Sequence, residues 1–150
     1  MADVMVRAKE ILGGLTLKEK IGQLNQEAFL FKDSEIVKER VRKGELGAII
    51  LATSATAGND KQEKVYYEVI DEIQKTALTE SRTGIPLLFG RDIIHGYNTV
   101  FPVPLALSAM FNPELVKKGY EYVAKETKNN GVNWTFAPMI DISRDPRWGR

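Results

Sequence analysis

The sequence contains no cysteine and a single histidine among its 150 residues. The lack of thiols excludes a disulfide framework, a thiolate zinc site and a cysteine nucleophile. One histidine cannot form a histidine-based metal cluster. There is also no P-loop, and no Gly-x-Gly-x-x-Gly turn follows a predicted strand. Zinc, nucleoside triphosphate and dinucleotide chemistry are therefore excluded.

Neither sign of charge dominates, since 21 lysine and arginine residues stand against 20 aspartate and glutamate residues, for a formal net charge of +1. No basic tract interleaves with aromatic residues, so nucleic acid is not expected as a partner. Long apolar runs are missing as well, and the amino terminus lacks the apolar core of a signal peptide. The sequence therefore predicts no membrane contact and a cytoplasmic location.

The remaining composition is that of an ordinary globular protein, because 43% hydrophobic and 27% charged residues argue against disorder and coiled coil. The length suits one domain, and no internal repeat, linker or low-complexity segment divides the chain.

Four segments carry the spacing and end signals of helices. The first begins with a capping box at Thr16–Glu19 and is predicted to bury one apolar stripe. That stripe consists of Leu17, Ile21, Leu24 and Ala28. The other three helices are predicted at 34–43, at 63–81, and between the N-cap Asn112 and Gly131.

Three apolar runs, at 48–51, 86–89 and 134–140, predict buried parallel strands. Strands separated by helices are typical of βαβ units, so the predicted class is α/β with a parallel sheet, either open and doubly wound or part of a barrel. In both architectures ligands bind at the carboxyl ends of the strands. The candidate site segments are 52–54, 90–92 and 141–150.

Asp92 is the first acidic residue after the second predicted strand, in a proline-containing loop of about 20 residues. An ionised carboxylate there could accept hydrogen bonds from ligand hydroxyls. Alternatively, Asp92 caps the following turn or pairs with Arg91 or His95. His95 itself could be a general base, although a single histidine without a serine, cysteine or metal partner is more often structural.

The last ten residues, DISRDPRWGR, are rich in charge. We interpret Arg144, Asp145 and Arg147 as an internal ion-pair lattice with Trp148 packed over it. Arg150 differs, because Gly149 lets the backbone approach a cavity and a guanidinium offers a planar fork to hydroxyls or carboxylates. Asp92 and Asp141 suggest a glycosidase carboxylate pair, but that requires a separation of about 5 to 9.5 Å, which a sequence cannot supply.

One family matches three separated stretches, which read LTLKEKIGQLNQ, PLLFGRDIIHGYNTVFPVPLALSAMFNPELV and GVNWTFAPMIDISRDPRWGR. They resemble the amino-terminal domain of glycoside hydrolase family 3, close to bacterial β-glucosidases, from Thr16 onward. The resemblance implies that residues 1–150 form the first, incomplete part of one (β/α)8 TIM-type barrel. It also implies hydrolysis of terminal non-reducing β-D-glucosyl residues of a β-glucoside or oligosaccharide, with retention and without a cofactor.

Carried over onto this sequence, the resemblance gives Asp92 and Arg150 as residues that bind the sugar in the −1 subsite. The family's nucleophilic aspartate, acid/base glutamate and lysine–histidine sugar-binding pair match no position here, so no catalytic residue is expected in this chain. Arg91 is a departure, since the family more often has an apolar or aromatic residue before this aspartate. A nearby cation would favour ionised Asp92 and could alter the sugar preference.

These gaps predict an amino-terminal fragment of a retaining β-glucosidase. A full barrel needs roughly 250 residues and closes its strand edges, whereas the predicted strands leave edges open. We therefore expect the isolated chain to be inactive and to fold partially or associate with itself. The alternatives are a non-catalytic sugar-binding or self-associating half-barrel, and a barrel enzyme of other chemistry that uses His95 with Asp92.

Overall fold

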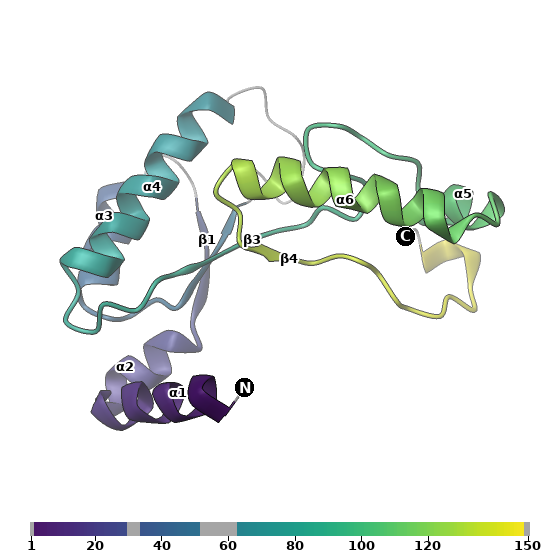
Figure 1. Ribbon diagram of the computed structural model, residues 1–150. Coiled ribbons are helices and arrows are strands. Elements are labelled where there is room, and N and C mark those ends of the chain that lie inside the picture. Colours follow the sequence, from purple (N-terminus) through teal and green to yellow (C-terminus); the bar gives the residue numbers. More distant parts are fainter. Residues whose placement is uncertain (1, 30–33, 52–62, 149–150) are drawn as a thin grey trace.

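The computed structural model describes residues 2–29, 34–51 and 63–148, which fold around one parallel β-sheet (Figure 1). Its strands are β1 (Gln26–Phe29), β2 (Ala48–Leu51), β3 (Leu88–Arg91) and β4 (Trp134–Thr135). They are hydrogen-bonded in the order β1-β2-β3-β4, and each neighbouring pair is parallel. The predicted α/β class with a parallel sheet is confirmed.

Helices fill the connections between these strands, as parallel crossovers require. These connecting helices are α3 (Ser34–Arg42), α4 (Glu63–Thr79), α5 (Pro104–Ala109) and α6 (Pro113–Asn129). α1 (Ala2–Gly14) and α2 (Leu17–Gln23) precede β1, and a short 3-10 helix at Pro146–Trp148 follows β4. In Figure 1, α3 and α4 lie side by side, α6 runs above the β3–β4 side, and α1 and α2 lie at the amino end of β1. None of the helices in the described ranges combines the length and apolar character needed to cross a membrane.

The core lies where the sheet meets α3, α4 and α6. Ile49 of β2 is paired in register with Phe89 of β3, and both side chains are buried. Ile73 of α4 and Val123 of α6 are buried in the same cluster. Because successive side chains of a strand point to opposite faces, Leu88 faces away from this core and is 47% exposed.

Three of the four predicted helices are confirmed. α3 ends before Gly44, whose φ of +68° suits glycine at a helix terminus. α4 lies within the predicted range 63–81. At the start of α6, the Asn112 side chain accepts a hydrogen bond from the Leu115 backbone N–H at 3.0 Å, with proline at the first helical position.

The first predicted helix is correct at its start and wrong beyond it. The capping box is present, with the Glu19 carboxylate accepting the Thr16 backbone N–H at 2.8 Å. α2 ends at Gln23, however, and Ala28 lies in β1, a strand that was not predicted. The expected buried stripe is exposed instead: Leu17, Ile21 and Leu24 are 74%, 61% and 88% exposed.

The buried side of α2 is set by close packing of backbone, which apolar periodicity does not report. Gly22 lies against the carbonyl of Gly44, so that a Cβ on Gly22 would be 1.9 Å from that oxygen. Just after the helix, the Asn25 side-chain amide donates to the Glu45 carbonyl at 3.0 Å. The chain is thereby turned into β1 beside β2.

Two predicted strand boundaries also need correction. The run at 86–89 becomes a strand only at Leu88, because the Leu87 backbone N–H donates to the Gln74 side chain at 2.9 Å instead of to a ladder. The run at 134–140 pairs only over Trp134–Thr135, and Pro138 has no N–H with which to continue it. β3 therefore ends at Arg91 rather than Phe89, which brings Asp92 directly to its carboxyl end.

Glu19 links α2 to the turn after α4. The Arg82 Nε donates to Glu19 Oε1 at 2.7 Å, and the Arg82 Nη2 donates to Glu19 Oε2. This pairing, together with the hydrogen bonds from Thr16, lowers the pKa of the Glu19 carboxyl from 4.5 to about 2. Because the folded-state pKa is lowered, the stabilisation is fully present above pH 4.5 and is lost as the pH falls towards 2.

Replacing Glu19 by glutamine is therefore expected to lower the urea midpoint of unfolding at pH 7, and to lower it much less at pH 3. The amide keeps the shape of the side chain but cannot be ionised. The measurement is urea unfolding at both pH values, with Glu10→Gln on α1 as the matched control that follows the wild type. An equal loss of midpoint for Glu19→Gln at both pH values would contradict the assignment.

Candidate functional site

The carboxyl ends of the strands define the candidate site, as parallel sheets require. Residues 52–54, predicted to contribute after β2, lie outside the described part of the chain. The site is therefore built from Asp92, which follows β3, and from the residues that follow β4. In Figure 1, β3 and β4 lie below α6, and the chain after β4 continues beneath α6 towards α5.

Asp92 is half-buried and anchored between residues that cannot move freely. Arg91 before it is paired with Thr135 of β4, while Ile93 and Ile94 after it are buried. The Ile94 backbone N–H donates to Asp92 Oδ1 at 3.3 Å. The predicted turn-capping role is thus present, and it fixes the carboxylate at the strand end where a ligand would meet it.

An aromatic pair at the neighbouring strand lies on the sheet face to which Gly90 and, two residues further, Asp92 belong. The rings of Trp134 and Phe136 meet edge to face, with centroids 5.1 Å apart and planes at 82°. Both rings cover Gly90, where a Cβ would come within 2.7 Å of Phe136 and 3.3 Å of Trp134. Trp134 is 38% exposed. The prediction of the site missed this pair, although two aromatic residues in the last strand were a signal that could have found it.

Aromatic surface near a carboxylate can bind a small polar ligand. Binding sites for small molecules are lined mainly by apolar and aromatic groups, with a few polar groups that set orientation. Among the residues described here, no group of three or more acidic, histidine or cysteine side chains could hold a metal ion. The arrangement can therefore bind a ligand through hydroxyl hydrogen bonds and ring contact.

Arg91 is buried and stacks on an aromatic ring. Its guanidinium carbon lies 4.5 Å from the centroid of the Tyr97 ring, and Tyr97 is itself buried. Since side chains alternate along a strand, Arg91 and Asp92 leave the chain in opposite directions. The expected effect of this cation on Asp92 and on sugar preference stays a prediction.

His95 is half-buried and lines a cavity that does not include Asp92. Its Nδ1 is buried and finds no hydrogen-bond partner among the residues that the structure describes. The cavity measures about 720 Å³, and Asp92 is not among its lining residues, which include His95, Ser108, Ser143, Arg144, Asp145 and Trp148. The structure thus brings His95 to the DISRDPRWGR segment rather than to a general-base position next to Asp92.

Within residues 141–148, which the structure describes, the predicted ion-pair lattice is reduced to one local pair, Arg147 with Asp145. The Arg147 Nε donates to Asp145 Oδ1 at 2.9 Å, and this hydrogen bond lowers the pKa of Asp145 and raises that of Arg147. Trp148, which was expected to pack over the lattice, is 54% exposed. Asp141 is exposed, and Arg150, the second predicted sugar-binding residue, lies outside the described residues.

A parallel α/β sheet with a carboxylate and aromatic rings at its carboxyl end agrees with what comparison of the sequence shows. Residues 16–150 match the model of the glycosyl hydrolase family 3 N-terminal domain. The chain belongs to this family.

Individual relatives agree with that assignment. A periplasmic β-glucosidase of Salmonella typhimurium is 37% identical over 142 residues, covering 94% of this chain and 17% of its own length. β-Glucosidase C of Emericella nidulans is 29% identical, covering 96% of this chain and 25% of its own length. The chain therefore spans about a sixth to a quarter of these curated relatives.

Solved structures confirm the fold. An exo-1,3/1,4-β-glucanase from a Pseudoalteromonas species superimposes with a TM-score of 0.78 at 27% identity, over 99% of this chain and 19% of that chain. A β-glucosidase from Listeria innocua, solved in complex with isofagomine, superimposes with a TM-score of 0.73 at 34% identity. The match covers 96% of this chain and 19% of that chain. These neighbours are TIM-barrel amino-terminal domains of the family, so the predicted barrel class is confirmed for the part present here.

Proposed function

We propose that this chain forms part of the −1 sugar subsite of a retaining β-glucosidase that hydrolyses terminal non-reducing β-D-glucosyl residues. Family membership over residues 16–150 supports glycosidase chemistry, and the named relatives include β-glucosidases of a bacterium and a fungus. The observation that carries the proposal is Asp92, fixed at the carboxyl end of β3 on the sheet face of the Trp134–Phe136 pair.

In this proposal Asp92 accepts hydrogen bonds from sugar hydroxyls, since a carboxylate accepts more strongly than a neutral oxygen. Arg150 contacts the same sugar. No residue of the chain is assigned to nucleophilic or acid/base catalysis, because Asp92 serves binding and Asp141 lies on an exposed segment. A retaining mechanism needs two carboxyl groups about 5 to 5.5 Å apart. We expect that pair outside these 150 residues. The cytoplasmic location of the protein stays a prediction.

The test is a titration of the isotope-labelled 150-residue chain with methyl β-D-glucoside, followed by amide resonances. Saturable shifts are expected around Asp92 and Trp134–Phe136 at millimolar sugar, which corresponds to about −4 kcal/mol or weaker. Sorbitol at equal concentration is the control and should leave these resonances in place. In parallel, 4-nitrophenyl β-D-glucoside should release no nitrophenol. Shifts unrelated to the β3–β4 edge, or measurable release, would contradict the proposal.

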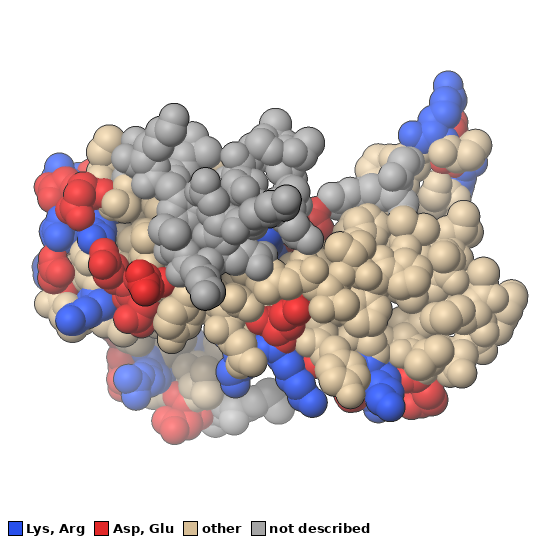
Figure 2. Space-filling view, turned by 90° about the horizontal axis from the view of Figure 1, so that it is seen from above, with Lys and Arg blue, Asp and Glu red and all other residues tan. Residues whose placement is uncertain are grey.

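A second candidate is a non-catalytic half-barrel that binds sugar and associates with itself. Large apolar side chains are exposed around α5 and the start of α6, with Leu105 79%, Phe111 93% and Leu115 52% exposed. Figure 2 shows a broad surface free of charged side chains on this side of the molecule, whereas charges gather over the α3–α4 end. Open apolar surface of this kind promotes association. Light scattering on the titration sample separates a defined oligomer from a monomer.

A further inference from the structure

The loop that carries Asp92 into α5 is held at its tip by one carboxylate of α6. Glu126 Oε2 accepts the backbone N–H groups of Asn98 and Thr99 at 3.0 and 3.1 Å, and its Oε1 accepts the Thr99 hydroxyl at 3.1 Å. The partners are separated by 27 and 28 residues in sequence. These three hydrogen bonds on one carboxylate lie at the solvent-exposed tip of the loop, and together they form a clamp between the loop and α6.

A second contact from the same helix reaches the base of the loop. The Tyr120 hydroxyl donates to the Ile94 carbonyl at 3.0 Å. The N–H of the same residue, Ile94, donates to Asp92 Oδ1 at 3.3 Å. One helix therefore holds the segment that follows Asp92 at its base and at its tip. The contact at the base is made to Ile94, two residues after Asp92.

The path of the loop between these two contacts leaves it little freedom. Gly96 has a φ of +97°, and a Cβ there would lie 2.0 Å from the Thr99 carbonyl oxygen. The Phe101 ring approaches both Gly96 and Gly119 of α6, to 3.1 and 3.2 Å from where their Cβ atoms would be. The Phe101 N–H also donates to the His95 carbonyl at 2.7 Å. A displacement of the tip would thus be passed along a tight turn to the residues after Asp92.

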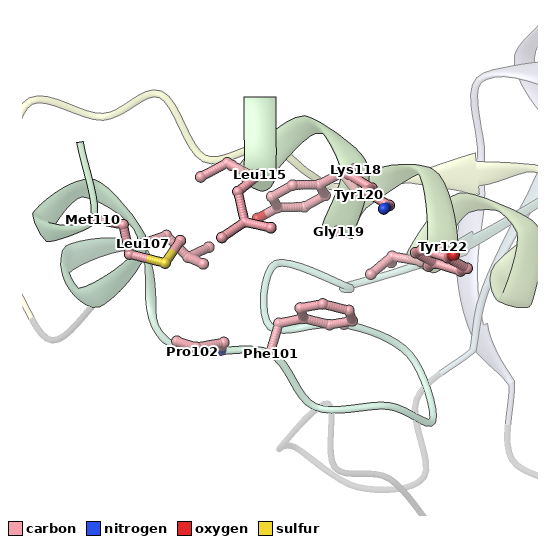
Figure 3. Close-up of a pocket in the computed structure, with 12 residues that line it drawn as sticks. Phe101, Pro102, Leu107, Met110, Leu115, Lys118, Gly119, Tyr120 and Tyr122 are labelled. Atoms are coloured by element: carbon pink, nitrogen blue, oxygen red, sulfur yellow. The ribbon is translucent and has the colours of Figure 1, made fainter. Parts of the chain in front are cut away.

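Apolar packing does not fill the space behind this loop. A cavity of about 370 Å³ lies between the loop, α5 and α6 (Figure 3). Its walls are mostly apolar, with Phe101 and Pro102 on one side and Leu107, Met110, Leu115 and Tyr120 around it. Buried Ile93, Ile94 and Tyr97 anchor the base of the loop. Asn98 and Thr99 at its tip are exposed, and the hydrogen bonds from Glu126 hold this part of the loop against α6.

From this geometry we infer that Glu126 is a positioning residue for Asp92, acting through the 93–101 loop rather than by touching the sugar. The inference rests on the proposed function, in which Asp92 binds sugar hydroxyls. Loss of the clamp leaves the Asn98 and Thr99 N–H groups to water and loosens the tip, and the tight turn at Gly96 passes this change to Ile94, whose N–H orients the Asp92 carboxylate. Sugar affinity therefore falls although no group that contacts sugar has changed.

The experiment compares Glu126→Ala and Glu126→Gln with Glu121→Ala, an exposed glutamate of the same helix, in the 150-residue chain. For Glu126→Ala we expect about a tenfold weaker affinity for methyl β-D-glucoside, displaced amide resonances for Asp92 and Ile94, and faster amide exchange at Asn98 and Thr99. Glu126→Gln retains an acceptor oxygen and should recover part of the affinity. Glu121→Ala should match the wild type in every readout.

The resonances of Asp92 decide between positioning and simple stabilisation. If Glu126→Ala speeds exchange at the loop tip but leaves the Asp92 resonance and the sugar affinity unchanged, the inference is overturned. If the wild-type chain binds no sugar, the proposed function fails for this chain, and the Asp92 resonance still tests the coupling. Should Glu126→Ala not fold, Glu126→Gln provides the same comparison, and a wild-type Asp92 resonance together with wild-type affinity in that variant would overturn the inference.

Discussion

Substitution of Gly22 by alanine is expected to lower the free energy of unfolding by about 3 kcal/mol or more, because the added methyl group overlaps backbone. Its Cβ would lie 1.9 Å from the Gly44 carbonyl oxygen and 2.9 Å from the Gly44 carbonyl carbon. These atoms belong to the turn that leads into β2 and cannot rotate away as a side-chain end could. Separation of α2 from this turn would also remove β1 from its place beside β2.

The control for this prediction is Gly13→Ala on α1, where a Cβ would meet nothing within 4 Å. Alanine in an open helical position should stabilise the chain by about 0.5 to 1 kcal/mol. Urea unfolding followed by circular dichroism measures both variants. Equal unfolding midpoints for Gly22→Ala and the wild type would show that α2 does not pack on the 44–47 turn.

The second large effect is expected at Asp92. Asp92→Asn should weaken binding of methyl β-D-glucoside at least about tenfold, because the charged acceptor is replaced by a weaker neutral one. The amide oxygen can still accept the Ile94 N–H, so the loop and the urea midpoint should change little. This separation of binding from folding makes the variant informative.

Asp141→Asn provides the matched comparison, since Asp141 lies on an exposed segment beyond β4 and is given no role in the subsite. Its affinity should equal that of the wild type in the same titration. If Asp92→Asn bound sugar as tightly as the wild type while Asp141→Asn did not, the subsite would have to be moved from the β3 end to the later segment.

Local signals in the sequence predicted much of the fold. The buried strand at 48–51, the helix that ends before Gly44 and the capped start of α6 are all present, because each depends on residues close together in the chain. β1 was missed because Gln26 and Glu27 lack the apolar character of a buried strand. The strand exists through its pairing with β2, which is a property of the folded sheet.

The candidate site was predictable only in part, for the same reason. Asp92 could be found from its position after an apolar run. Trp134 and Phe136 reach the site only because β4 pairs with β3, more than 40 positions away in the chain. Glu126 contacts the Asp92 loop across 27 and 28 residues, and no spacing rule links a glutamate in a helix to a distant turn.

Gly90 allows the two aromatic rings of the proposed subsite to lie close to the strand backbone. Because glycine has no side chain, the Phe136 ring lies where a Cβ at position 90 would be only 2.7 Å from it, and the Trp134 ring lies where that distance would be 3.3 Å. A sugar resting on these rings would therefore sit closer to the strand backbone, and hence nearer the level of Asp92, than any side chain at position 90 would allow. The absence of a side chain at Gly90 thus sets how close the two rings lie to the strand backbone. A larger residue at position 90 would raise the ring surface relative to Asp92, although position 90 itself does not contact the ligand.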